Sequence, residues 1–155
     1  MEQTKTPKIK HATFRQFTNG ELTRYRPFLL ALLAESFGMP EDAEQVRTQF
    51  THMLTGHGQG WGVFAVVNGK TAPAGLVVTR LVDDRIWKHR TLWVDTINVY
   101  PGLPDTLWDN ALARLEAFAL ENGASRIEGL VVAPEVLNRL RGRFRELGTM
   151  VVREL

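Results

Sequence analysis

Asp95 is the residue whose type and position most directly suggest chemistry. It lies in the stretch 93–100 (WVDTINVY), which we interpret as extended chain whose successive side chains point to two faces in turn. A period of two predicts a β-strand, one face of which carries Trp93, Asp95, Ile97 and Val99. A carboxylate among apolar side chains on a central strand is costly unless it is paired or solvated, so this strand indicates a polar cleft with Asp95 as a candidate general base. The alternatives are a structural carboxylate that pairs with an arginine such as Arg80, or one that faces solvent.

A break and a helix follow this strand. Pro101, Gly102 and Pro104 end the strand, and apolar residues then recur at helical spacing, at Leu107, Ala111, Leu115 and Phe118. Ligands commonly bind at such a junction in α/β proteins, because a helix N-terminus presents unpaired N–H groups and the positive end of its dipole. The first turn of the helix is therefore a second candidate site.

The glycine-rich run 56–62 (GHGQGWG) lacks the context of a phosphate-binding loop. It precedes a predicted strand instead of following one, so we expect a flexible connection from a helix into the sheet, which could still contact a partner. His52 and His57 lack the spacing of metal ligands on a helix, and His11 and His89 are isolated, so no metal site is expected. The chain has no cysteine, which excludes thiolate nucleophiles, disulfides and cysteine zinc sites.

One short segment carries four arginines, at Arg139, Arg141, Arg143 and Arg145. We interpret it as a solvated helix whose cations favour the C-terminal end, because neither an aromatic platform nor a binding motif accompanies them; the alternative is a site for nucleic acid or an acidic partner. The tryptophans fall into two groups. Trp61 and Trp93 are expected in the core, whereas Trp87 and Trp108, if exposed, would indicate an interaction surface.

Size and composition are those of a single globular domain spanning residues 1–155, with 44% hydrophobic residues and a net charge of +2. That charge is too small to indicate a nucleic-acid partner. The N-terminal sequence lacks the apolar core of a signal peptide, and no apolar run is long enough to span a bilayer. We therefore expect a soluble protein that is neither secreted nor inserted in a membrane.

Periodicity and turn residues give the elements that must position these side chains. Strands are predicted at 8–17, 61–67, 74–82, 91–99, 126–132 and 149–153, and helices at 18–37, 40–54, 105–122 and 134–147. Thr18 and Glu21 have the spacing of a capping box. Hairpin turns are expected at Asn68-Gly69 and Asp83-Asp84, and helix C-termini at Gly38, Gly123 and Gly148. The order is β-α-α-β-β-β-α-β-α-β, an α/β fold with a three-strand antiparallel meander and a mostly buried fifth strand parallel to the fourth.

This order resembles that of the GNAT (N-acetyltransferase) superfamily over essentially the whole chain. Residues 9–13 (IKHAT) are similar to the family's opening strand, Val99-Tyr100-Pro101 to its V-x-P after the fourth strand, and residues 144–148 (FRELG) to its Y-x-x-x-G. The resemblance implies a GNAT-like mixed central sheet whose fourth and fifth strands splay apart around the pantetheine arm of acetyl-CoA. It also implies a loop, R/Q-x-x-G-x-G/A, that opens the third helix and holds the cofactor's pyrophosphate. The cofactor-binding positions implied in this chain are Ile97, Asn98, Val99, Pro104, Asp105, Thr106, Leu107 and Trp108.

The loop departs from the family pattern. With Val99 and Pro101 as reference points, the basic residue and the following glycine-rich positions fall on Pro104, Asp105, Leu107 and Asp109. Glycine lets the backbone approach the phosphates, so Leu107 and Asp109 are expected to place bulk on that surface. Asp105 and Asp109 also add negative charge where a pyrophosphate would bind. Phe144 stands where many members carry the tyrosine that protonates the leaving thiolate.

We therefore expect a degenerate GNAT-like protein that binds no cofactor and acts as a non-catalytic binding or structural module with a protein partner or further copies of itself. Degenerate members occur in bacterial and phage genomes, so the expected location is the cytoplasm or an intracellular or virion assembly. The first alternative is an acetyl-CoA-dependent N-acyltransferase in which Asp95 is the base, directly or through a water, and main-chain groups at 97–99 hold pantetheine. The second alternative is a nucleic-acid-associated protein that uses the arginine-rich last helix.

Overall fold

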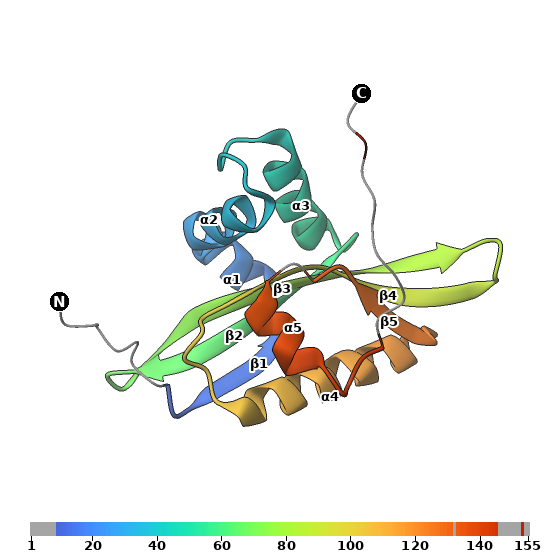
Figure 1. Ribbon diagram of the computed structural model, residues 1–155. Helices are drawn as coiled ribbons and strands as arrows, with labels where there is room; N and C mark the ends of the chain where they lie inside the picture. The colour runs from blue at the N-terminus through green and yellow to red at the C-terminus, as the bar shows by residue number, and fades with distance from the viewer. Residues whose placement is uncertain (1–8, 132, 146–152, 154–155) are drawn as a thin grey trace.

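The computed structural model describes residues 9–131, 133–145 and 153, and these contain one five-stranded sheet with helices on both faces (Figure 1). The elements in chain order are β1 (Ala12–Gln16), α1 (Asn19–Arg24), α2 (Arg26–Phe37), α3 (Glu44–Thr55), β2 (Gln59–Val67), β3 (Lys70–Asp84), β4 (His89–Val99), α4 (Asp105–Glu121), β5 (Arg126–Gly129) and α5 (Pro134–Leu140). The strands lie in the order β1-β2-β3-β4-β5; β4 and β5 run parallel and the other neighbours antiparallel. This mixed architecture confirms the predicted fold class.

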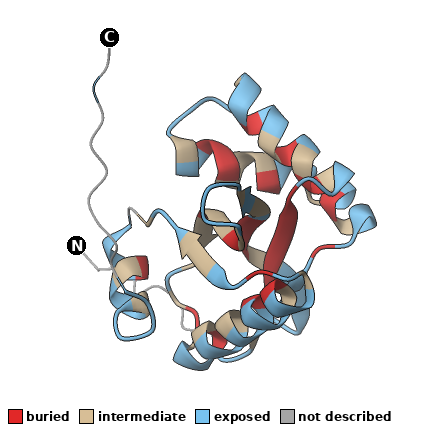
Figure 2. Ribbon diagram, turned by 90° about the vertical axis from the view of Figure 1, so that its right-hand side faces the viewer, coloured by how far each residue is buried: buried red, intermediate tan, exposed pale blue. Residues whose placement is uncertain are grey.

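Two apolar clusters hold the sheet between its helices. One lies between the sheet and α1–α3 and includes the fully buried Leu29 and Leu33. The other lies between the sheet and α4. There the ring of Phe14 stacks on Trp61 with centroids 5.6 Å apart, and Phe118 meets Trp61 edge-on at 5.2 Å. Figure 2 shows buried positions in the sheet and along the inner sides of the helices, so the sheet is packed on both faces.

Close packing around β2 explains its glycines. Residues 59–65 are all buried. A Cβ atom at Gly62 would lie 2.5 Å from Cε2 of Phe64 and 2.6 Å from Cζ of Phe17, so only glycine fits between these rings. The flexible connection expected at 56–62 is therefore wrong from Gln59 onward, because that part of the run is a buried strand.

A short chain of buried hydrogen bonds joins β2 to β3. The indole N–H of Trp61 donates to the hydroxyl of Thr79 at 2.9 Å, and that hydroxyl donates to Oε1 of Gln59 at 3.0 Å. All three polar groups are buried, and each would be costly without a partner. These hydrogen bonds therefore fix the register of β2 against β3.

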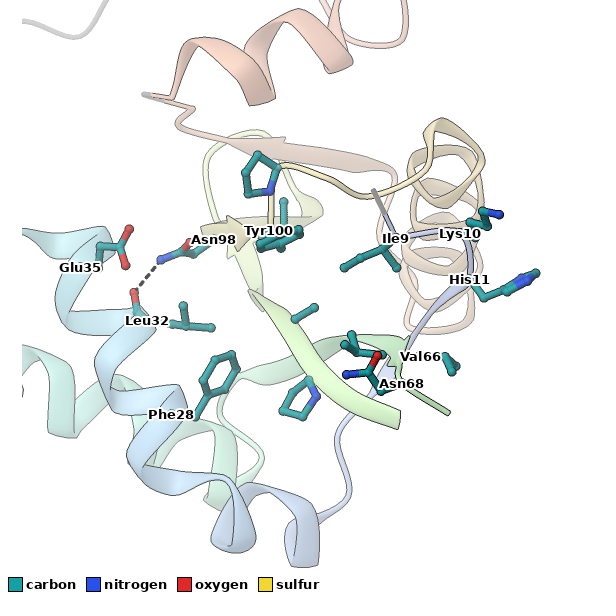
Figure 3. A pocket seen from close by; sticks show the side chains of 15 residues that line it. Ile9, Lys10, His11, Phe28, Leu32, Glu35, Val66, Asn68, Asn98 and Tyr100 are labelled. Carbon is teal, nitrogen blue, oxygen red and sulfur yellow. Dashed lines mark hydrogen bonds between the residues drawn. The ribbon is translucent and has the colours of Figure 1, made fainter. Parts of the chain in front are cut away.

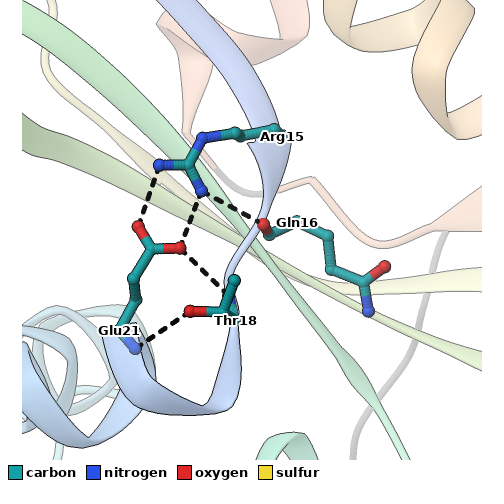
Figure 4. Close-up of polar contacts among 4 residues, drawn as sticks. All are labelled: Arg15, Gln16, Thr18 and Glu21. Atoms are coloured by element: carbon teal, nitrogen blue, oxygen red, sulfur yellow. Dashed lines mark hydrogen bonds and ion pairs between the residues drawn. The ribbon is translucent and has the colours of Figure 1, made fainter.

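The predicted capping box at the start of α1 is confirmed (Figure 4). Thr18 Oγ1 accepts from the main-chain N–H of Glu21 at 3.1 Å, and Glu21 Oε1 accepts from the main-chain N–H of Thr18 at 3.2 Å. Arg15 of β1 donates to both carboxylate oxygens of Glu21, at 2.8 and 2.9 Å. The hydrogen bond from Arg15, followed by those from Thr18, lowers the pKa of Glu21 to about 2.

Three helix boundaries differ from the predictions. The helix expected at 18–37 is two helices that meet at Tyr25, because Pro27 has no N–H to continue the ladder of α1. α3 begins at Glu44 and not at residue 40, since residues 40–43 form a turn in which the N–H of Ala43 donates to the carbonyl of Pro40. α5 ends at Leu140, because the next residue is extended, with φ −56° and ψ 134°.

The left-handed C-terminal glycines are confirmed where the structure describes them. Gly38 follows α2 with φ 61°, and Gly123 follows α4 with φ 73°. The Asn68-Gly69 hairpin is confirmed as well, with positive φ at both residues. Gly148 and, apart from Arg153, the strand predicted at 149–153 lie outside the described residues.

The other strand ends differ from the predictions. β3 continues through Asp83 and Asp84, and the turn falls at residues 85–88, because Oδ1 of Asp84 accepts from the main-chain N–H groups of Ile86 and Trp87, both at 2.9 Å. β5 is half exposed and not mostly buried. Its only neighbour in the described sheet is β4, so it has the exposure of an edge strand.

A β-bulge interrupts β4 at Asp95. Val78 of β3 lies opposite Thr96 and Thr79 lies opposite Val94, which leaves Asp95 without a partner on β3. The side chains that reach the cluster beneath α4 are Leu92 and Val94 before the bulge, and Ile97 and Val99 after it. The prediction of one face shared by Trp93, Asp95, Ile97 and Val99 is therefore wrong, because the extra residue reverses the alternation.

Candidate functional site

β4 is paired on both edges only in its first half. β5 lies opposite Thr91–Val94, and the pairing ends where Val94 faces Gly129. A Cβ atom at Gly129 would lie 2.9 Å from the carbonyl oxygen of Val94, so glycine permits this last close approach. Among the described residues, Thr96–Val99 pair with β3 alone, Asp95 has no partner on β3, and the other main-chain edge of 95–99 has no strand beside it. Such an edge could pair with an extended ligand.

Asp95 lies at the start of this open edge. Nε of Arg80 donates to both of its carboxylate oxygens, at 3.1 and 3.0 Å. The side chain of Asp95 is 16% exposed and that of Arg80 is 48% exposed, so the carboxylate is sheltered while the guanidinium reaches solvent. The structure thus contains the arginine pair that was the alternative to a catalytic base. A catalytic role for Asp95 stays a prediction.

The side chains of the implied pantetheine-binding residues take part in packing and internal hydrogen bonds. Ile97 and Val99 pack against the cluster beneath α4. Asn98 lies on the other face and donates its amide to the carbonyl of Leu32 in α2, at 3.1 Å (Figure 3). The neighbouring Thr96 hydroxyl is buried and has no hydrogen-bond partner among the described residues. Main-chain groups are therefore what this segment could offer a ligand.

The first turn of α4 is acidic and lacks a side-chain cap. Pro104 is the N-cap, Asp105 and Thr106 are exposed, Leu107 is buried and Trp108 is half-buried. Because Leu107 packs into the core, its side chain does not crowd the helix N-terminus, and the sequence-based expectation that it would is wrong. The obstacle to an anion here is the charge of the acids.

Two arginines from the α5 region are ion-paired with these acids. Arg139 of α5 pairs with Asp105. Arg143, which follows α5, pairs with Asp109 through Nε at 3.0 Å, and its Nη1 also donates to the carbonyl of Arg139 at 2.8 Å. The predicted solvated helix therefore holds only the first of the four arginines. The two paired arginines reach the acids at the start of α4, although both ion pairs remain exposed to solvent.

A cavity of about 790 Å³, which we call the sheet-end recess, lies where the β2–β3 hairpin, α2 and the end of β4 meet (Figure 3). Its walls include Phe28, Leu32, Val66, Val67, Pro73 and Val99. Three of these side chains remain exposed: Phe28 at 36%, Val66 at 46% and Val67 at 50%. Sequence reasoning missed this recess. The available signal was the pair Val66-Val67 beside the turn, because consecutive strand residues point to opposite faces and cannot both enter one core.

The remaining candidates divide by exposure. Trp61 is buried as expected, Trp93 is only half-buried, and Trp87 is 75% exposed.

The histidines and acids form no metal site within the described residues. His57 Nδ1 lies 2.8 Å from the hydroxyl of Thr55. In residues 9–131 and 133–145, no three histidine, aspartate or glutamate side chains gather as metal ligands. No helix in the described part of the chain is long and apolar enough to cross a bilayer.

No family model and no curated protein matches this sequence, but solved structures share its fold. An aminoglycoside N-acetyltransferase in complex with CoA superposes with a TM-score of 0.68 at 14% identity, over 94% of this chain and 95% of that one. A predicted acetyltransferase with acetyl-CoA from Clostridium acetobutylicum gives 0.66 at 13% identity, over 93% and 96%. The ribosomal-protein-alanine N-acetyltransferase from Brucella melitensis biovar Abortus 2308 gives 0.63 at 19% identity, over 93% and 99%.

The chain has the GNAT fold. At these identities the likeness establishes the architecture and carries no residue roles, so the residues present decide whether acetyl-CoA fits. The open edge of β4 fits the extended pantetheine arm that a GNAT cofactor would place there. The start of α4 does not fit the pyrophosphate, because Asp105 and Asp109 stand there and the nearby Arg139 and Arg143 are already paired with them.

Proposed function

We propose that this GNAT-fold chain is a non-catalytic binding module of a larger protein assembly and that it does not use acetyl-CoA. The observation that supports this most is the pairing of Asp105 with Arg139 and of Asp109 with Arg143 at the first turns of α4. A phosphate that approached this helix end would meet two carboxylates, or would have to displace both ion pairs. Either event removes the advantage that a free helix N-terminus gives an anion.

Two further residues support the absence of catalysis. Phe144, at the position of the family's acid, is 38% exposed and has no proton to donate. Asp95, the candidate base, is already bonded through both oxygens to Arg80. The 75% exposure of Trp87 supports a binding role, because tryptophan is enriched at the energetic centres of protein interfaces.

Titration with acetyl-CoA, by calorimetry and by thermal shift, tests the proposal. A ligand at 100 times its dissociation constant stabilises a fold by about 2.7 kcal/mol, so binding would be visible as a shift in Tm. We expect no heat and no shift at millimolar acetyl-CoA. Micromolar binding by the unmodified chain would overturn the proposal.

A charge-removing variant tests the stated cause. Asp105→Asn combined with Asp109→Asn should gain measurable affinity for CoA if the acids are what repels the pyrophosphate. The matched control is Asp83→Asn, which removes one exposed carboxylate, paired with Arg90, at the far end of β3. The control should gain no affinity.

The second candidate function is an acetyl-CoA-dependent N-acyltransferase with an atypical phosphate loop. The open edge of β4 at 95–99 favours it, because main-chain groups near the β4–β5 divergence have no strand beside them among the described residues. Binding of acetyl-CoA that Asp95→Asn weakens would favour this candidate. We do not propose nucleic-acid binding, because Arg139 and Arg143 are paired with carboxylates.

A further inference from the structure

The turn between β3 and β4 presents two large apolar side chains to solvent. This hairpin tip, residues 85–88, contains Ile86 at 82% exposure and Trp87 at 75%. Oδ1 of Asp84 orders the turn by accepting hydrogen bonds from the main-chain N–H groups of Ile86 and Trp87, both at 2.9 Å. An ordered projection loses less conformational entropy on docking than a flexible one. The hairpin tip is therefore suited to insertion into an apolar pocket.

An apolar pocket lies at the other end of the same strand pair. β3 runs for 15 residues from the β2–β3 turn, which borders the sheet-end recess, to the hairpin tip. At about 3.3 Å per residue these two ends are about 45 Å apart. Figure 1 shows the two hairpins projecting at opposite ends of the sheet. A chain cannot fill its own recess with its own tip, but it can fill that of a neighbour.

The recess matches the tip in size and polarity. Pockets of about 300–1,000 Å³ hold ligands of drug size, and an indole with one branched aliphatic side chain falls in that class. At about 790 Å³ the recess can receive both side chains. Phe28, Val66 and Val67 would lose their exposure on docking, which is the favourable change expected of apolar surface.

Charge gives the contact an orientation. Arg85 and Lys88 flank the two apolar side chains, and Glu35 borders the recess; all three are exposed, and none forms an ion pair within the described residues. Lys10, also exposed, borders the recess too and would repel the cations of the tip. The tip is therefore expected to enter with its cations on the side of Glu35.

We propose that the hairpin tip of one copy docks into the sheet-end recess of the next, so that the chain associates with itself head to tail. This inference deepens the proposed function, since it names the partner as a second copy. The two surfaces differ and lie at opposite ends of the sheet. Such a contact joins copies either into an open or ring-closed series, or into a two-fold dimer in which each tip fills the other copy's recess.

Sedimentation velocity over a range of protein concentrations tests the proposal. We expect the mean mass of the unmodified chain to rise above that of the monomer with concentration, and Trp87→Ala to remain monomeric. Leu120→Ala is the matched control, because Leu120 is 74% exposed on α4 but lies in neither surface. It should associate like the unmodified chain. Circular dichroism must show that each variant is folded.

A mixing experiment gives the decisive result. Trp87→Ala keeps an intact recess, and Val66→Lys, at a 46% exposed position of the recess wall, keeps an intact tip. Each variant alone should be monomeric, and a mixture of the two should form a 1:1 dimer that grows no further. Glu35→Lys should weaken self-association and Lys10→Glu should strengthen it, each by several-fold.

Three outcomes would overturn the inference. They are a monomer at every concentration, a dimer that Val66→Lys leaves intact, and a monomer whose tip instead binds vesicles of anionic phospholipid. The acetyl-CoA titration is independent of all three. If the chain binds acetyl-CoA and still associates, only the non-catalytic proposal is overturned. If the chain is monomeric and does not bind acetyl-CoA, only the head-to-tail contact is overturned.

Discussion

Arg80 donates through Nε to both carboxylate oxygens of Asp95, at 3.1 and 3.0 Å, beside the bulge in β4. The bulge leaves Asp95 without a main-chain partner on β3, and the side-chain pair links the two strands at that point. A carboxylate that the sequence offered as a base is thus part of the internal bonding of the sheet. Its contribution to stability can be measured separately from any contribution to function.

Asp95→Asn and Arg80→Met should each destabilise the fold, and the double variant should lose less than the sum of the two. We expect a coupling of about 0.5–1 kcal/mol, because Arg80 is 48% exposed and ion pairs open to solvent are weak. Urea unfolding of the four proteins gives this value. Strictly additive losses would show that the pair contributes nothing to folding.

Local chemistry made much of the fold predictable. The capping box at Thr18 and Glu21, the Asn68-Gly69 hairpin and the left-handed glycines Gly38 and Gly123 each depend on a few adjacent residues, and the structure confirms these four features. From β1 to α5 the element order followed from periods of 2 and 3.6 residues, except that the helix expected at 18–37 is two helices. What sequence alone could not give depends on partners far along the chain.

The bulge at Asp95 shows this limit most clearly. A uniform period of two over residues 93–100 assigns Trp93 and Ile97 to one face, whereas the extra residue places them on opposite faces. The adjacent polar pair Asp95-Thr96 interrupts the polar–apolar pattern there, but the pairing of β4 with β3 is what forms the bulge. The burial predicted for β5 failed for a similar reason, because exposure depends on which strands lie beside it.

The sequence indicated the acids of the candidate site but not the arginines that pair with them. Asp105 and Asp109 could be read from the sequence as obstacles to a pyrophosphate. The arginine that pairs with Asp109 lies 34 residues later in the chain, beyond the end of α5, and only the tertiary fold brings the two together. The sheet-end recess was likewise not predictable as a cavity, since α2, β2, β3 and β4 all contribute to it, and Val66-Val67 alone indicated only exposed apolar side chains.

Gly62→Ala should destabilise the fold by about 1–3 kcal/mol, the range typical of an overpacked core. The new Cβ atom would lie 2.5 Å from Phe64 and 2.6 Å from Phe17, and both rings are buried. Gly20→Ala is the matched control, because its nearest contact would be an ordinary 3.9 Å and it lies in α1, where alanine favours the helix. Thermal unfolding should separate the two, with a fall in Tm for the first and none for the second.

Glu21→Gln should reduce stability at neutral pH and have no effect near pH 2. The pKa of Glu21 is lowered from 4.5 to about 2 in the folded chain, so ionisation of its carboxylate stabilises the fold above pH 4.5. That contribution falls as the pH drops from 4.5 towards 2. Glutamine can keep a capping hydrogen bond but loses the charge that Arg15 pairs with, so we expect a loss of about 1 kcal/mol at pH 7.

Urea unfolding of the unmodified chain and of Glu21→Gln from pH 7 to pH 2 measures this difference. The two curves should converge at the acid end. Curves that stay parallel over the whole range would show that the charge of Glu21 is not what stabilises the start of α1.

Replacing Arg139 and Arg143 with alanine should loosen α5 without unfolding the sheet. Both ion pairs are exposed, with side-chain exposures of 42% and 81% for Arg139 and Asp105, and 37% and 62% for Arg143 and Asp109. Pairs of this kind contribute less than about 1 kcal/mol each and are screened by salt. Hydrogen exchange should therefore be faster in the α5 amides of the variant at low salt, and should match the unmodified chain at high salt.

Arg141→Ala, which removes an exposed arginine with no ion pair in the described part, is the control and should leave exchange unchanged. Equal exchange in all three proteins at low salt would instead assign the docking of α5 to apolar contacts such as that of the buried Val136.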